Sequence, residues 1–84
     1  MENMQDFIEL GERIRKSKIR QTGKFKSIMN NLGTIETIEL YHAICKMLLQ
    51  EEIEFQCLIN AGIDFKLGEI KEEDFRKMIL VCLV

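Results

Sequence analysis

The chain has 84 residues, of which 46% are hydrophobic and 31% are charged, and its formal net charge is −2. This length predicts a single domain over residues 1–84, with a folded surface of about 5,200 Å² and little room for an enclosed active site. The apolar fraction excludes long disordered segments, and no apolar run approaches the roughly 20 residues that a membrane-spanning helix needs.

The first predicted helix runs from about residue 3 to residue 20. Its apolar residues recur at helical spacing and form one stripe: Met4, Phe7, Leu10, Gly11 and Ile14. Glycine inside a helix costs about 1 kcal/mol relative to alanine. At Gly11 the missing side chain would let a second helix approach closely. We expect this helix to end near Gly23, in the left-handed conformation that glycine adopts easily.

The second predicted helix covers residues 24–32. Its apolar residues follow the spacing i, i+3, i+4, i+7: Phe25, Ile28, Met29 and Leu32. Gly33 is expected to end this helix. Thr34 is predicted to be the N-cap of the next helix, because its hydroxyl can accept a hydrogen bond from a free backbone N–H.

The third predicted helix, residues 35–60, is the longest and has two apolar faces. One face contains Ile38, Tyr41, Cys45, Leu48 and Leu49. The other face contains Leu40, Ile44, Met47, Phe55 and Leu58. Because the polar stripe is narrow, we expect this helix to pack against neighbours on two sides. Glu51 and Glu52 fall within the apolar arc, which indicates a kink or break near residues 50–52.

Residues 63–70 are predicted to form a loop after Gly62, and residues 71–84 to form the last helix. Its first turn is acidic, which suits the positive end of a helix dipole. The apolar run 78–84 also has strand propensity, so a terminal strand is the alternative. The fold prediction is all-α: a compact bundle of four to five helices around a long central helix of about residues 35–60.

The charges are divided unevenly along the chain. Residues 1–12 carry −4, residues 13–26 carry +7 without any acid, and residues 27–84 carry −5. The basic residues of the middle segment are Arg13, Arg15, Lys16, Lys18, Arg20, Lys24 and Lys26. Such a block can neutralise phosphates, so DNA or RNA binding is one functional hypothesis. The alternative is a solvated face, or a docking site for acidic residues of a second copy. Only Phe25 is placed to stack on a base.

No motif for catalysis or cofactor binding is present: G-x-S-x-G, the P-loop, G-x-G-x-x-G, H-E-x-x-H and C-x-x-C are all absent. His42 and Cys45 are one helical turn apart, but zinc would need further ligands at a recognised spacing. Cys45, Cys57 and Cys82 lie in apolar stretches and are odd in number, as expected of free thiols in a reducing compartment. We therefore predict no metal, no cofactor and no enzymatic activity, and a cytoplasmic location.

The apolar run 78–84 must be buried, either in the chain's own core or against a partner, because its exposure would promote aggregation. Together with the two-faced helix, it exceeds what so short a chain easily covers. The sequence therefore predicts a small regulatory or adaptor protein that binds another protein, or itself as a homodimer, through apolar helix faces. Its size and composition also fit an inhibitor carried by a phage or mobile element. The residues predicted to contact the partner are Ile79, Leu80, Val81 and Leu83.

Overall fold

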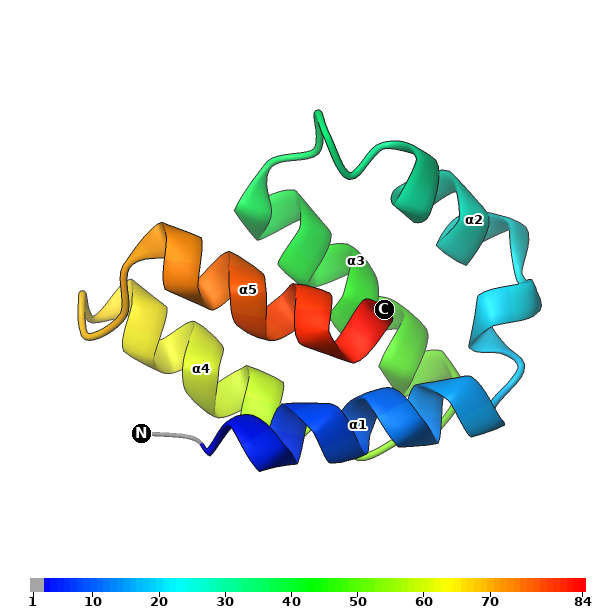
Figure 1. The fold of residues 1–84 in the computed structure, drawn as a ribbon, viewed down its shortest axis with the longest axis horizontal. Helices are drawn as coiled ribbons and strands as arrows, with labels where there is room; N and C mark the ends of the chain where they lie inside the picture. Colours follow the sequence, from blue (N-terminus) through cyan, green and yellow to red (C-terminus); the bar gives the residue numbers. More distant parts are fainter. Residues whose placement is uncertain (1–2) are drawn as a thin grey trace.

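The computed structural model describes residues 3–84. Within this range the chain forms five α-helices and one 3-10 turn, without any β-strand (Figure 1). In chain order they are α1 (Met4–Lys16), η1 (Ile19–Gln21), α2 (Gly23–Asn30), α3 (Thr37–Gln50), α4 (Gln56–Lys66) and α5 (Glu72–Leu83). The prediction of a small all-α bundle is confirmed, and the apolar C-terminal run is helical rather than a strand.

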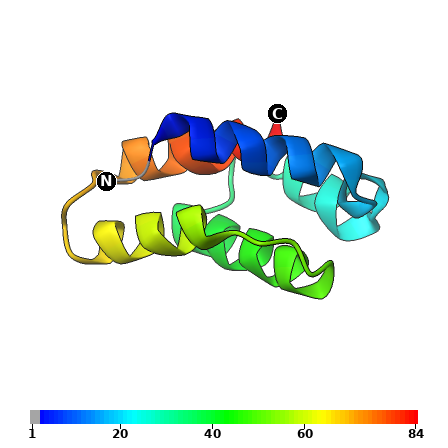
Figure 2. The same cartoon turned by 90° about the horizontal axis from the view of Figure 1, so that it is seen from below.

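The helices are arranged in two layers (Figure 2). α1 and α5 lie side by side in one layer, with α2 at one end, and α3 and α4 form the other layer. α1 packs more extensively on α5 than on any other helix. The buried side chains between the layers form one hydrophobic cluster. The folded surface of 5370 Å² agrees with the value expected for a chain of this length.

At Gly11, α1 lies directly against the backbone of α5. Of its stripe, Phe7, Leu10 and Ile14 are buried, whereas Met4 at the start of the helix is 43% exposed. A Cβ added at Gly11 would lie 3.2 Å from the carbonyl oxygen of Cys82, which belongs to the backbone of α5. The close approach predicted from the glycine is therefore present, and it brings α5 against the apolar face of α1.

α1 ends at Lys16, earlier than the predicted end between residue 20 and Gly23. Gly23 begins α2 and does not adopt the left-handed conformation predicted for it. Ser17 provides the physical reason for the early end of α1. Its hydroxyl donates to the carbonyl of Ile14 at 2.7 Å and accepts from the N–H of Ile19 at 3.1 Å. These side-chain hydrogen bonds compete with the next helical turn and direct the chain into η1, which buries Ile19.

The segment 35–60 forms two helices rather than the single long helix that was predicted. α3 ends at Gln50, and α4 begins at Gln56. Between them Glu52 has a φ of 56°, in the left-handed region that non-glycine residues seldom adopt. The break leaves Glu51 and Glu52 exposed, whereas a continuous helix would direct both carboxylates into the apolar arc. The break therefore lies where the sequence indicated a kink.

Three further boundaries differ from the predictions. α2 ends at Asn30, before the predicted end at Gly33. The N-cap of α3 is Glu36, while Thr34 lies in the preceding turn, where its hydroxyl donates to the carbonyl of Asn31 at 3.3 Å. α4 continues through Gly62 to Lys66, so the first part of the predicted loop 63–70 is helical. α4 has a glycine at position 62 because the side chain of Tyr41, from α3, lies against it.

Candidate interaction surfaces

The C-terminal residues predicted to contact a partner lie largely inside the chain. Ile79 is 0% exposed and Leu83 is 1% exposed, while Leu80 and Val81 are half-buried. Of the two alternatives that the sequence left open for the apolar run, burial in the chain's own core therefore applies to Ile79 and Leu83, and partner contact at Leu80 and Val81 stays a prediction. The physical reason is the close contact at Gly11, which lets α5 bury these side chains in the core.

α3 has the two apolar faces that the sequence predicts, and the chain covers only one of them completely. Leu40 and Ile44, on one face, are buried in the core. Leu48, at the edge of the other face, is buried as well. On that other face, Ile38 is 45% exposed and Leu49 is 66% exposed. One side of α3 therefore presents large apolar side chains to solvent.

α4 extends this exposed apolar surface. Ile63 is 51% exposed, and with Ile38 it lines a cleft of about 190 Å³ between the two helices. The full lining is Ile38, Tyr41, His42, Ile59, Gly62, Ile63, Phe65, Lys66 and Phe75. Within residues 3–84, no acidic side chain lines the cleft. We call Ile38, Ile63 and this cleft the α3–α4 apolar surface.

Three aromatic rings meet at this cleft. The ring centroid of Phe75 lies 5.2 Å from that of Tyr41, and it stacks on Phe65 at 4.8 Å. Gly62 makes room for Tyr41, since a Cβ there would overlap the Tyr41 hydroxyl and lie 2.6 Å from Cζ. Burial, with a smaller contribution from Cys45, raises the pKa of Tyr41 to about 12. The Tyr41 ring therefore occupies the space that a larger residue at position 62 would take.

The sequence prediction missed Ile63 and Phe65 because it placed both in a loop. The available signal is the helical spacing from Ile59 to Ile63, which continues across Gly62. Glycine usually marks the end of a helix, and here the ring of Tyr41 accounts for it instead.

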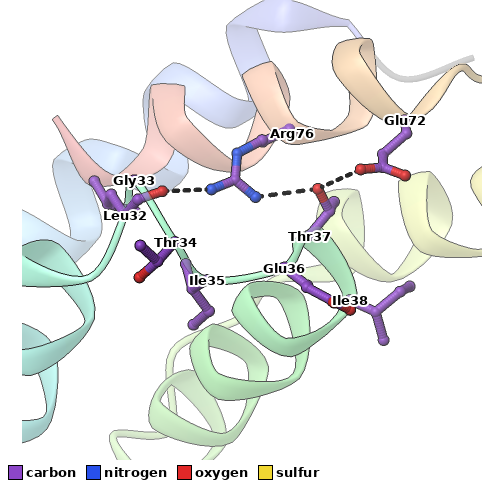
Figure 3. A pocket seen from close by; sticks show the side chains of 9 residues that line it. All are labelled: Leu32, Gly33, Thr34, Ile35, Glu36, Thr37, Ile38, Glu72 and Arg76. Carbon is purple, nitrogen blue, oxygen red and sulfur yellow. Dashed lines mark hydrogen bonds between the residues drawn. The ribbon is translucent and has the colours of Figure 1, made fainter.

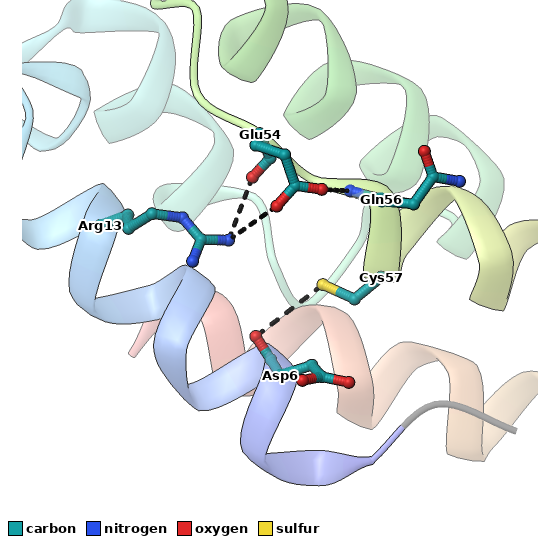
Figure 4. Close-up of polar contacts among 5 residues, drawn as sticks. All are labelled: Asp6, Arg13, Glu54, Gln56 and Cys57. Carbon is teal, nitrogen blue, oxygen red and sulfur yellow. Dashed lines mark hydrogen bonds and ion pairs between the residues drawn. The ribbon is translucent and has the colours of Figure 1, made fainter.

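Arg13, from the predicted basic segment, connects α1 to the chain just before α4 (Figure 4). Its Nη2 lies 3.5 Å from Oε2 of Glu54 and donates to the Glu54 carbonyl oxygen at 3.1 Å. The other carboxylate oxygen of Glu54 accepts from the backbone N–H of Gln56. Both charged side chains are more than 40% exposed, so the pair contributes about 0–1 kcal/mol. Arg13 is thus already engaged within the chain.

Arg15 and Arg20 also contact the chain itself. Arg15 Nη1 donates to the carbonyl oxygen of Val84 at 3.2 Å, and the guanidinium of Arg20 lies 5.5 Å from the ring centroid of Phe25. Phe25 is only 3% exposed, so the one ring in this segment is not available for stacking on a base. The remaining cations are exposed and form no ion pair with a carboxylate of residues 3–84: Lys16, Lys18, Lys24 and Lys26.

A cavity of about 620 Å³ lies between the loop before α3 and α5 (Figure 3). Arg76 donates to the carbonyl of Leu32 at 2.7 Å and to the hydroxyl of Thr37 at 3.1 Å. That hydroxyl, on a residue only 3% exposed, donates to Glu72 at 3.2 Å. Because these polar groups satisfy one another, they hold the loop against α5 rather than forming a reactive constellation.

Two of the three cysteines have a raised pKa. Cys57 and Cys82 are buried, and Cys45 is half-buried. Burial raises the pKa of Cys82 to about 12 and also raises the pKa of Cys45. Both therefore stay protonated at neutral pH, where a thiol is a poor nucleophile and metal ligand. Across residues 3–84, no group of three His, Cys, Asp or Glu side chains is placed to hold a metal ion.

Comparison with known proteins adds no functional constraint. No family model matches the chain, and no curated protein or solved structure shows significant similarity to it. None of the helices in the described range is long and apolar enough to cross a membrane.

Proposed function

We propose that this chain is a small regulatory or adaptor protein that binds another protein through the α3–α4 apolar surface. The observation that carries the proposal is the exposure of Ile38 and Ile63, 45% and 51%, on either helix of an apolar cleft. Concave, aromatic-lined pockets are where protein interfaces concentrate their binding energy. The partner would insert an apolar side chain between the two isoleucines, next to Tyr41.

The same surface permits self-association. A second copy of the chain would bring its own Ile38 and Ile63 to the interface, as a two-fold homodimer requires. Sedimentation equilibrium distinguishes the two cases, because self-association depends on the concentration of the purified chain alone. In both cases the same residues carry the contact.

The test compares three variants that place a charge on an exposed isoleucine. Ile38→Glu and Ile63→Glu alter the α3–α4 apolar surface, and Ile8→Glu is the matched control, on α1 in the other layer and 40% exposed. Affinity purification from the native cell, with nuclease treatment, measures partner capture, and circular dichroism checks the fold.

If the proposal is correct, the α3–α4 variants lose capture or dimerisation by about 30-fold or more, as at an interface hot spot. The Ile8→Glu variant behaves like the wild type. Equal capture by all three variants, with the helical content intact, would show that the partner binds elsewhere.

A second candidate function is nucleic-acid binding, favoured by the exposed, unpaired side chains of Lys16, Lys18, Lys24 and Lys26. If all four contact phosphates, the logarithm of duplex-DNA affinity falls with the logarithm of salt concentration with a slope of about −3.6. Replacing the four lysines by glutamate should then abolish binding while α1 and α2 remain helical. Binding that is independent of salt contradicts this candidate.

A further inference from the structure

A second groove lies on the other side of α3, between α3 and α2. In Figure 1, α2 and α4 are on opposite sides of α3. The groove has a volume of about 320 Å³, within the range of roughly 300–1,000 Å³ typical of ligand sites. Its apolar lining comes from Ile28 of α2 and Ala43 of α3, both half-buried, and from the edge of Met47, which is only 6% exposed. These side chains are those that an apolar residue of a partner would contact.

The polar lining of this groove consists of two lysines and two neutral residues, Ser27 and Gln50. The two lysines are Lys24 of α2 and Lys46 of α3, and both are exposed. None of the lining residues in the described part of the chain is acidic. Neither lysine forms an ion pair with a carboxylate of residues 3–84. The α2 side belongs to a stretch, residues 13–35, that contains no acidic residue at all. The groove therefore combines an apolar lining with two uncompensated positive charges.

We propose that the α2–α3 groove binds an acidic amphipathic segment of a partner protein. Apolar side chains of that segment contact Ile28, Ala43 and Met47, and its carboxylates face Lys24 and Lys46. Charge complementarity favours an acidic segment, because its carboxylates would supply negative charge opposite Lys24 and Lys46. The lining runs along α3 from Ala43 to Gln50, about 10 Å of helix, which matches roughly two turns of a bound helix.

The groove fits an acidic protein segment better than a nucleic acid. A phosphate backbone gains nothing from the apolar side chains of Ile28 and Met47, and the neighbouring ring of Phe25 is too deeply buried to stack on a base. The site is separate from the α3–α4 apolar surface, so this proposal and the proposed function can fail independently.

The test uses the full chain and a fluorescein-labelled helical peptide of about 14 residues, with leucines along one face flanked by glutamates. Three further probes are compared with it: the peptide with leucines replaced by serines, the peptide with glutamates replaced by lysines, and a DNA duplex. Fluorescence anisotropy measures affinity at about 150 mM salt. NMR of the ¹⁵N-labelled chain locates the peptide through the amides of Ile28 and Ala43.

We expect the acidic amphipathic peptide to bind, and each altered peptide to bind about tenfold more weakly or not at all. The double variant Lys24→Glu/Lys46→Glu should lower the affinity about tenfold. The control variant Lys71→Glu/Lys77→Glu makes the same two charge reversals on exposed lysines at α5, outside the groove, and should bind within about twofold of the wild type.

Four results would overturn the proposal. The serine peptide binds as well as the leucine peptide, which shows charge attraction alone. The lysine peptide binds equally, which removes charge complementarity. The duplex binds through Lys24 and Lys46 while the peptide does not, which identifies nucleic acid as the occupant. No probe binds at about 1 mM, which shows that the groove takes no such ligand.

Discussion

Gly11 and Gly62 both lie inside helices, and each permits a close contact, but the contacting atoms differ. At Gly11 the nearest atoms belong to the backbone of α5, and at Gly62 they belong to the end of the Tyr41 side chain. Backbone atoms can make room for an added Cβ only if the whole helix moves, whereas a side chain can make room by rotating. The α1–α5 contact is therefore fixed, while the α3–α4 contact can be reshaped by one rotating ring.

This difference explains where the exposed apolar surface lies. The fixed α1–α5 contact buries Ile79 and Leu83, although they belong to the longest apolar run of the chain. The α3–α4 contact leaves Ile38 and Ile63 partly in solvent beside a cleft. The length of an apolar run is thus a weaker guide to exposure than the distance at which its neighbouring helix packs.

The largest expected effect is the loss of core packing at the α1–α5 contact. Ile79→Ala removes a fully buried side chain and should lower the free energy of unfolding by about 3 kcal/mol. Leu80→Ala, at the next position of α5 but only half-buried, is the control and should cost about 1 kcal/mol. Urea denaturation measures both values. Equal costs would mean that α5 is not seated against α1 as described.

The next effect tests the backbone contact at Gly11. Gly11→Leu should destabilise the fold by about 2 kcal/mol, because overpacking against the α5 backbone exceeds the gain in helix propensity. In Gly11→Ala the Cβ would be 3.2 Å from the Cys82 carbonyl oxygen. The cost of this tight contact and the gain in helix propensity should nearly cancel in the free energy of unfolding. If Gly11→Leu proved as stable as the wild type in urea, the close approach of the helices would be refuted.

Gly62→Ala should have a small effect on stability but a clear effect on Tyr41. The new Cβ displaces the ring, while alanine improves helix propensity by about 1 kcal/mol. Since Tyr41 is the single tyrosine, its phenolate absorbance reports this position alone. The pKa of Tyr41 should fall from about 12 towards 10 as the ring moves into solvent. An unchanged titration midpoint would show that Gly62 does not position the ring.

The raised pKa of Tyr41 also gives a direction to the pH dependence of stability. Below pH 10 the phenol is protonated in both the folded and the unfolded chain, so it adds no pH dependence. Between pH 10 and about 12 only the unfolded chain ionises, so stability falls as the pH rises through this window. Tyr41→Phe should remove this part of the alkaline destabilisation in denaturant titrations.

The smallest effect is expected at the exposed ion pair between α1 and the chain before α4. Arg13→Ala should cost about 0–1 kcal/mol, because both side chains are well exposed to solvent. High salt should reduce this difference further through screening. A cost above about 2 kcal/mol would mean that Arg13 supports packing as well as the ion pair.

Much of the helical pattern was predictable because it depends on local spacing. The stripe of α1 and the break near residues 50–52 both follow from neighbours along the chain. The ends of helices were less predictable. Ser17 stops α1 by a side-chain hydrogen bond, and Gly62 continues α4 because of a ring that comes from another helix.

The candidate surfaces were only partly predictable for the same reason. The two-faced character of segment 35–60 and the seven basic residues are visible in the sequence. Which of the two faces is covered is decided by the neighbouring helices, and so is the engagement of Arg13, Arg15 and Arg20 within the chain. Spacing along the chain contains no information about which distant residues of the same chain will contact a given side chain.

By itself, the sequence determines that this protein is helical and that its positive charge is concentrated in residues 13–26. It also determines that segment 35–60 has apolar side chains on two faces. Only the tertiary structure decides which apolar residues remain exposed. Helix formation depends on residues three and four positions apart, whereas burial depends on how closely two helices distant in sequence pack. The backbone contact at Gly11 closes one side of the molecule, and the cleft beside Tyr41 leaves the other open.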